Sequence, residues 1–356
     1  MATTMAPDPA ILPDVLPTDR LRASGRPAPP LSAELRRIPT ARNVVAVAGC
    51  YVQSLGVIAL AAWLHHPLAY VACFLLMGRS HAMFASLAHE AAHRLLFPNR
   101  RVNDWVGRWV LGAPALVPTD LYRRGHLAHH RDEFGPDEPD MALYAGYPMA
   151  SDSVRRKLVR DLVGISGWKN LKGLLRGLRS DFAKTHARRI LVAQVVLLAV
   201  AAAAGRVELY VLLWFAPWMT VWRVINRLRS IAEHGGMMRS KDRRQTTHHV
   251  RQTWLPRFLI VPLNTGWHLA HHVDMGVPWR NLPALHRELV DAGWVTPALT
   301  HPTYRSLWRT LRSRPADAPG DAPAGRTSRS TSARSLGDPS GPVLQSTERM
   351  VARDRS

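Results

Sequence analysis

The sequence predicts an all-α integral membrane protein with two transmembrane helical hairpins, about four spans in all, and a cytoplasmic helical cap that holds a metal site. Two observations carry this prediction. Apolar runs of membrane-spanning length alternate with strongly basic polar regions. Three histidine clusters with helical spacing stand next to the apolar runs rather than in their middle.

The first expected hairpin begins with the 21-residue apolar run Val44–Leu64, which is long enough to cross a hydrocarbon core of about 30 Å. A short polar break at 65–67 follows. The next apolar stretch, 68–77, continues beyond Arg79 into 82–88. As one long helix, this segment would leave the membrane near Arg79 and carry the first histidine cluster beyond the lipid.

The second expected hairpin consists of Ile190–Ala204 and Leu209–Trp222, which only four residues separate. Both runs are short for a span, and Pro217 interrupts the second one. The two remaining histidine clusters lie in the polar regions 119–189 and 223–313.

Charge gives the expected orientation. The chain has 47 Lys and Arg against 26 Asp and Glu, a net charge of +21. These basic residues flank the apolar runs, whereas the two short hairpin turns, 65–67 and 205–208, contain one arginine between them. By the positive-inside rule, both termini and all three clusters are cytoplasmic, in a cell or inner membrane. No nucleic-acid-binding motif is present, so a nucleic-acid partner is not expected.

Three domains are expected. Residues 1–41 form a flexible basic N-terminal segment, 42–313 form the membrane domain, and 314–356 form a disordered tail rich in Arg, Ser and Pro. The chain has only two cysteines, Cys50 and Cys73, a number that excludes a thiolate metal site. Both lie in apolar runs, so a disulfide framework is not expected.

The clusters share the spacing i, i+3 or i+4, which places side chains on one helix face. They read H-E-A-A-H and then twice H-L-A-H-H. Neutral imidazole binds Zn, Cu, Fe and Ni, so the ligands alone leave the metal open. H-E-A-A-H by itself also fits a zinc protease with Glu90 as the base. The two repeated clusters are more specific, and together the three favour a shared polynuclear centre.

This set of clusters around two membrane hairpins resembles the membrane fatty acid desaturase and hydroxylase superfamily, over roughly residues 42–290. The segment 227–235 looks like that family's additional-histidine segment, and 264–272 looks like its third histidine box. The resemblance implies a non-haem di-iron centre with two Fe ions, O₂ as co-substrate, and oxidation of C–H bonds in a lipid chain. The metal ligands that it implies are His89, His93, His126, His129, His130, His234, His268, His271 and His272.

Several residues are candidates to support these ligands. Glu90, Glu233 and Asn264 are placed to bond the far ring nitrogens or a metal-bound water, as are the acids of the run 137–140, Asp137, Glu138 and Asp140. Ser230 stands one turn before His234, where the family can have an asparagine. Among the other histidines, His248 and His249 are expected at the surface, His65 and His66 on the opposite side of the membrane, and His81 in helix packing.

The function that the resemblance favours is O₂-dependent desaturation of a lipid acyl chain. A hydroxylase or oxygenase acting on an alkyl or isoprenoid chain is the alternative, and a membrane metal-binding or zinc-dependent protein is a third. A transporter would place its ligands within the spans, and the clusters lie beyond them. The terminal segments are too short for a redox domain. A separate soluble electron donor of ferredoxin, rubredoxin or cytochrome type is therefore expected.

Overall fold

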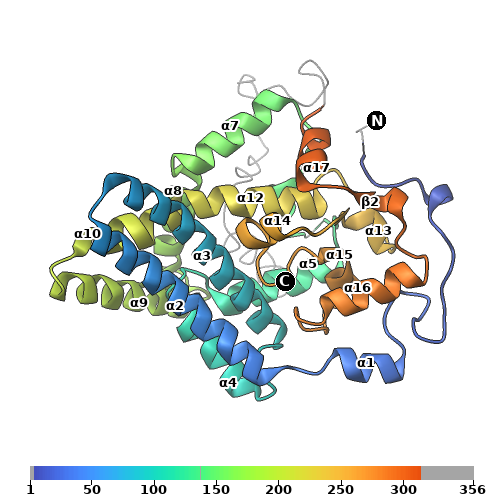
Figure 1. Ribbon diagram of the computed structural model, residues 1–356, viewed down its shortest axis with the longest axis horizontal. Coiled ribbons are helices and arrows are strands. Elements are labelled where there is room, and N and C mark those ends of the chain that lie inside the picture. Colours follow the sequence, from blue (N-terminus) through green and yellow to red (C-terminus); the bar gives the residue numbers. More distant parts are fainter. Residues whose placement is uncertain (1–3, 137, 314–356) are drawn as a thin grey trace.

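The structure, a computed structural model, describes residues 4–136 and 138–313 and is mostly helical with very little strand, as predicted (Figure 1). The α-helices are α1 (Pro29–Leu35), α2 (Thr40–Leu64), α3 (Pro67–His93), α4 (Arg100–Trp105), α5 (Thr119–Arg131), α6 (Met141–Tyr144), α7 (Ser151–Leu162), α8 (Ile165–Gly177), α9 (Lys184–Ala203), α10 (Val207–Tyr210), α11 (Ala216–Met219), α12 (Val221–His234), α13 (Arg243–Thr246), α14 (Trp254–Leu259), α15 (His268–Val273), α16 (Leu282–Asp291) and α17 (Tyr304–Leu311). Two π-helical turns (Val106–Gly112 and Val211–Phe215), two 3₁₀ turns (Pro9–Ile11 and Pro297–Leu299) and a parallel pair of two-residue strands, β1 (His249–Val250) and β2 (Thr300–His301), complete the described chain.

Three helical stretches are long and apolar enough to cross a membrane: Pro29–Leu64, which contains α2, Pro67–His93, and Lys184–Ala203. The outer faces of α2 and α9 expose large apolar side chains; Val52 of α2, for example, is 71 % exposed, and Val195 of α9 is 64 % exposed. Exposed apolar surface on this scale is typical of a lipid-facing helix. Figure 1 shows α2, α3, α9 and α10 on one side of the molecule and α13 to α17 on the other.

The fourth expected span, Leu209–Trp222, does not form one continuous helix. It consists of the end of α10, a π-helical turn and α11, and the backbone leaves helical geometry at Thr220 before α12 begins. Pro217 has no N–H to donate to the preceding turn, which explains why regular α-helical bonding fails in this segment.

Helix α3 lies at the centre of the fold, and most of its C-terminal half is buried. It packs against α2, α5 and α12. The α3–α12 crossing is close at Gly78, where an added Cβ would lie 2.2 Å from Val221 Cγ1. A glycine at this position therefore sets how near α12 approaches the helix that carries the first histidine pair.

The N-terminal segment is folded against α15 and α16, which differs from the expected flexible lead-in. Leu21 and Leu35 are buried in a cluster with side chains of α15 and α16. Arg36 forms an ion pair with Asp274, whose oxygen lies 2.8 Å from Arg36 Nη2. The burial of these few apolar residues orders a segment whose composition suggested disorder. The disordered tail expected over 314–356 lies outside the described residues.

Candidate metal centre

Four helices bring all nine predicted histidines to one place, at the C-terminal end of α3. The end of α3 carries the first pair, α5 carries the next three, the last residue of α12 carries the sixth, and the short α15 carries the final three. Eight of the nine side chains are buried, and His93 is half-buried. The histidines concerned are His89, His93, His126, His129, His130, His234, His268, His271 and His272.

Five of these histidines form one group. His89, His93, His126, His130 and His271 each offer a ring nitrogen, and these atoms all lie within 4.8 Å of one another. The Nε2 atom of His130 is 3.1 Å from that of His126 and 3.0 Å from that of His271. The group thus combines ligands from three helices around one point.

The other four histidines form a second group. His234 Nε2 lies 3.1 Å from His268 Nε2, which in turn lies 3.0 Å from His272 Nε2. His129 joins His234 and His272 within 4.8 Å. The two groups are neighbours, since the rings of His130 and His272 have centroids 4.3 Å apart.

The chemistry of these groups fits metal ions. Burial, reinforced by neighbouring histidines, lowers the pKa of His126, His130 and His271 well below the usual value, so their rings are neutral near pH 7. The Nε2 atoms of His89 and His93 are buried without a hydrogen-bond partner among the described residues. Converging lone pairs with no proton to accept are what a bound cation requires, and neutral imidazole suits Fe, Zn, Cu or Ni.

Acceptors behind the rings fix which nitrogen faces the centre. Glu138 lies 2.9 Å from His129 Nδ1, Glu133 lies 2.5 Å from His272 Nδ1, and the carbonyl of Thr246 lies 2.9 Å from His234 Nδ1. Each acceptor holds its ring with Nδ1–H outward and Nε2 inward, as in many metal sites. Burial alone would lower the pKa of His129, but the hydrogen bond and charge of Glu138 raise it.

Glu133 was not among the predicted site residues. Its carboxylate is buried between His272 and Arg243, which also donates to it. Burial raises the pKa of Glu133, and the charge of Arg243 opposes this rise. The available sequence signal was its position, three residues after His130, in the turn that follows the helix carrying the second cluster.

Of the acids that were predicted, Glu233 lies at the centre and Glu90 does not contact a ring. Glu233 Oε1 is 3.5 Å from His268 Nδ1 and accepts a 2.7 Å bond from Arg229. Glu90 instead accepts a 2.9 Å bond from the backbone N–H of Trp279, and so joins α3 to the chain that follows α15.

The structure does not place Asn264 against His268. Its side chain donates to the Trp279 carbonyl and accepts from Arg257, both at 3.2 Å. Ser230 Oγ donates to the carbonyl of Asn226 within α12. Asp140 lines the cavity described below, and Asp137 lies outside the described residues.

The surface location expected for His248 and His249 is wrong. His248 Nε2 bonds the Gly235 carbonyl at 2.7 Å, and His249 Nδ1 bonds Thr300 Oγ1 at 2.9 Å. Both rings are buried because β1 pairs with β2 directly behind the end of α12. No local spacing foretells this pairing, since β1 and β2 are about fifty residues apart.

The remaining histidines lie away from the centre. His65 and His66 are exposed at the turn between α2 and α3. His81 is buried within α3, where its Nε2 lies 2.9 Å from the Trp214 carbonyl, which agrees with a role in helix packing.

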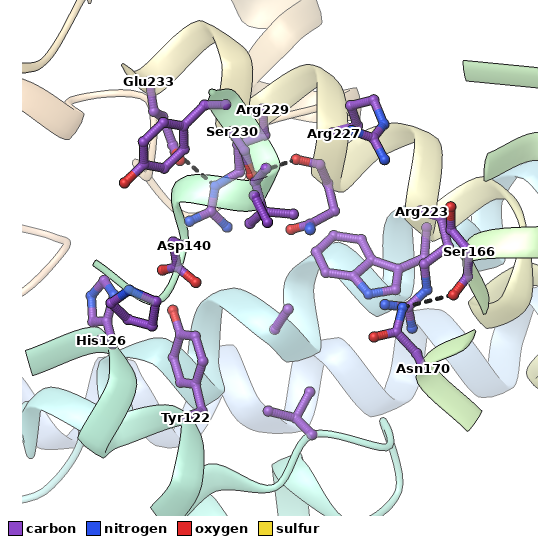
Figure 2. A pocket seen from close by; sticks show the side chains of 18 of the residues that line it. Tyr122, His126, Asp140, Ser166, Asn170, Arg223, Arg227, Arg229, Ser230 and Glu233 are labelled. Carbon is purple, nitrogen blue, oxygen red and sulfur yellow. Dashed lines mark hydrogen bonds and ion pairs between the residues drawn. The ribbon is translucent and has the colours of Figure 1, made fainter. Parts of the chain in front are cut away.

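A cavity of about 240 Å³ adjoins the centre. Figure 2 shows His126 and Tyr122 at one end of it and Arg223 and Asn170 at the other. Helices α8 and α12 form much of its far end. The histidines that line it come from both groups and are His126, His129, His234 and His268. A substrate in this cavity would therefore lie alongside both sets of ligands.

A second hollow, of about 410 Å³, lies on another side of the centre, beside the half-buried His93. Four arginines and one aspartate line it, so the charge of its lining is positive. These residues are Arg26, Arg36, Arg94, Arg123 and Asp274. We refer to it below as the basic hollow.

A largely helical membrane protein with nine converging histidines beside a cavity defines a class of histidine-ligated metalloproteins. Comparison with known families narrows this class, because a fatty acid desaturase family model matches residues 61–307. The chain therefore belongs to the fatty acid desaturase family, which confirms the resemblance that its histidine clusters indicated.

Two characterised relatives are similar at low identity. The chain is 25 % identical over 272 residues to a dihydrorhizobitoxine desaturase of Bradyrhizobium elkanii, a match that covers 71 % of this chain and 75 % of the relative. It is 26 % identical over 252 residues to an sn-1 oleoyl-lipid 12-desaturase of Arthrospira platensis, which covers 63 % of this chain and 68 % of the relative.

Proposed function

We propose that the protein is a membrane-bound, O₂-dependent desaturase whose nine histidines bind two iron ions. The observation that carries this proposal is the arrangement of the histidines in two adjacent groups, both of which border one cavity. The family match supports the same activity. Imidazole ligands suit this chemistry because, unlike thiolates, they survive a strong oxidant.

The proposed reaction removes two hydrogens from adjacent carbons of an alkyl segment and forms a carbon–carbon double bond. O₂ is reduced to two water molecules, with two electrons from the substrate and two electrons and two protons from outside. The bound metals supply the oxidising chemistry, and the protein positions the alkyl segment and excludes water. The lipid acyl chain of the second relative's substrate is one example of such a segment.

The electrons come from a separate soluble protein in this proposal, of ferredoxin, rubredoxin or cytochrome type. The basic hollow supports this partner, because it lies beside the centre's most exposed histidine and complements an acidic surface. With the positive-inside orientation, the hollow and the termini face the cytoplasm.

The contacts of Glu90 count against the zinc-protease alternative. A protease base must face a metal-bound water, whereas the Glu90 carboxylate holds the Trp279 backbone N–H. His89 and His93 also share their group with three further histidines, two of which a three-ligand catalytic zinc site would leave unused.

Metal analysis and lipid profiling of a bacterial host that expresses the full chain test the proposal. We expect about two irons per purified chain and host lipids or amphiphiles that have lost two hydrogens. His126→Ala and His234→Ala each remove one ligand, one from each group, and should lower the iron content and abolish the product. His65→Asn, at the exposed turn, is the matched control and should change neither.

Other outcomes would contradict parts of this proposal. Products that gain one oxygen atom, with iron still bound, would replace desaturation by hydroxylation on the same centre. About one zinc per chain, retained in both histidine variants, would overturn the di-iron desaturase altogether.

A further inference from the structure

The cavity beside the metal centre is not the apolar tunnel that a plain hydrocarbon chain requires. One wall is apolar and includes Leu116, Val117 and Leu174. The opposite wall, formed by α12, carries charged and amide side chains, among them Arg223 and Asn226. An amphiphilic wall of this kind fits a ligand with both an alkyl segment and a polar end.

Two of the arginines on α12 have partners that balance their charge. Arg227 forms a buried ion pair with Asp161, with Nη2 at 3.1 Å from Oδ1. The hydroxyl of Ser166 also donates to Asp161, so both carboxylate oxygens are engaged. Arg229 is paired with Glu233 at 2.7 Å.

Arg223 differs from both neighbours, because no carboxylate of the described residues lies within 4 Å of its guanidinium nitrogens. Its Nε donates to the Trp218 carbonyl at 3.0 Å, and its guanidinium carbon lies 4.3 Å from the centre of the Trp218 ring. Burial lowers the pKa of Arg223 to about 9, against the opposing charge of Asp161, which still leaves the group charged at neutral pH. The far end of the cavity thus contains a half-buried cation whose Nη atoms have no hydrogen-bond partner among the described residues.

Neighbouring amides extend this polar end. Asn170 of α8 uses one hydrogen of its side-chain NH₂ group on the Ser166 carbonyl, at 2.9 Å, and keeps the other. Asn226, one turn after Arg223 on α12, also lines the cavity. Figure 2 shows Asn170 next to Arg223, at the opposite end from His126. A guanidinium with adjacent amide donors is a typical site for an oxyanion.

We propose that the substrate carries an anionic group, a carboxylate or a phosphate, which Arg223 binds together with Asn170 and Asn226 while the alkyl segment lies along His126, His129, His234 and His268. This inference rests on the proposed function, and it names the substrate class. The distance along the cavity between the anion and the histidines would then select which carbons meet the centre. A neutral hydrocarbon chain would leave the Nη atoms of this half-buried guanidinium without a hydrogen-bond acceptor, which is unfavourable.

Binding of six-carbon probes to the iron-loaded, full-length protein in a neutral detergent tests the proposal. Hexanoate represents a free carboxylate, hexyl phosphate represents a lipid-type phosphate, and 1-hexanol is the neutral probe of equal length. We expect at least one anion to bind about tenfold more tightly than 1-hexanol, measured by calorimetry. The preferred anion identifies the source: hexanoate indicates a small organic acid, and hexyl phosphate indicates a phospholipid head group.

Variants of Arg223 locate the effect. Arg223→Met should lower anion affinity about tenfold, to the level of 1-hexanol, and Arg223→Lys should retain part of it. Arg309→Met, on the exposed face of α17, is the matched control and should bind like the unaltered protein. Iron content, measured on every sample, shows whether the fold is kept. If Arg223→Met loses its iron, Arg223→Lys takes its place in the test. The proposal then requires that Arg223→Lys bind the anions more weakly than the unaltered protein and bind 1-hexanol equally well.

Equal binding of 1-hexanol and both anions, or full anion affinity in iron-loaded Arg223→Met, would overturn the proposal. Its failure is separable from that of the proposed function. Selective anion binding without any desaturated product would leave the anion site standing and remove the activity. Desaturated products without selective anion binding would support the desaturase activity and remove the anion site.

Discussion

At the scale of single residues, Glu133 illustrates how the centre depends on groups that are not ligands. One buried carboxylate orients His272 and meets the charge of Arg243. Glu133→Gln removes this charge and keeps the size. We expect iron affinity to fall about 10- to 100-fold, because the His272 ring loses the anionic acceptor that fixes its Nε2 toward the metal. Competition with a chelator of known affinity measures the change.

A second glutamate offers the control for this prediction. Glu288 pairs with Arg20 on the outside of the cap, at 2.6 Å, and does not touch the histidines. Glu288→Gln should leave iron affinity unchanged, since exposed ion pairs contribute little. Unaltered affinity in Glu133→Gln would show that His272 needs no anionic partner.

The sequence predicts the histidines themselves well and their supports poorly. Spacing within a helix is a local property, so the clusters could be found without knowing the fold. The carbonyl of Thr246 reaches His234 only because the end of α13 lies against the end of α12. Arg223 has no ion-pair partner within 4 Å among the described residues because Asp161 lies against Arg227 instead. Such pairings come from tertiary contacts, which no short motif encodes.

At the scale of elements, the α3–α12 crossing depends on the absence of a side chain at Gly78. Gly78→Ala would push α12 away from α3, since its Cβ would overlap Val221. We expect a loss of stability of about 1–3 kcal/mol, seen as a lower Tm in detergent, together with weaker iron binding at His234. Adding Val221→Ala should restore part of both.

Gly49→Ala on α2 is the corresponding control, because nothing lies within 4 Å of a Cβ at that position. Its Tm should stay the same or rise slightly, as alanine favours a helix over glycine. Equal effects of the two substitutions would show that the crossing has room to spare.

A run of apolar residues does not by itself predict a continuous helix. The run Val44–Leu64 is uninterrupted by proline and forms one helix almost as predicted. Leu209–Trp222 has similar composition but is broken, because Pro217 prevents regular bonding. Residues 1–41 look disordered by composition, yet a few leucines such as Leu21 find apolar partners in α15 and α16.

At the scale of the whole molecule, the chain has a net charge of +21, and the basic hollow is lined by four of its arginines. Arg26 is exposed there and donates to the Val273 carbonyl next to the third histidine cluster. With an acidic [2Fe–2S] ferredoxin as the electron donor, Arg26→Glu should raise the KM for the donor several-fold at low salt. The difference should shrink toward 0.5 M salt, where the screening length is roughly 4 Å.

Arg305→Glu on the exposed side of α17 makes the same change in net charge elsewhere. It should alter the KM for the donor much less, and a small chemical reductant should support both variants equally. A similar KM in the Arg26 and Arg305 variants would mean that the donor approaches another face.

The packing of the N-terminal segment on α15 and α16 has a consequence for how the protein is made. The part of the chain that leaves the ribosome first packs on α15 and α16, which are made almost last. From His89 to His272, roughly 180 residues must be synthesised, which takes about 10–40 s at ordinary rates. Through most of that interval the histidines of α3 and α5 are present without those of α15. Both histidine groups are therefore complete only after α15 has been synthesised, and only then can the N-terminal segment find its apolar partners on α15 and α16.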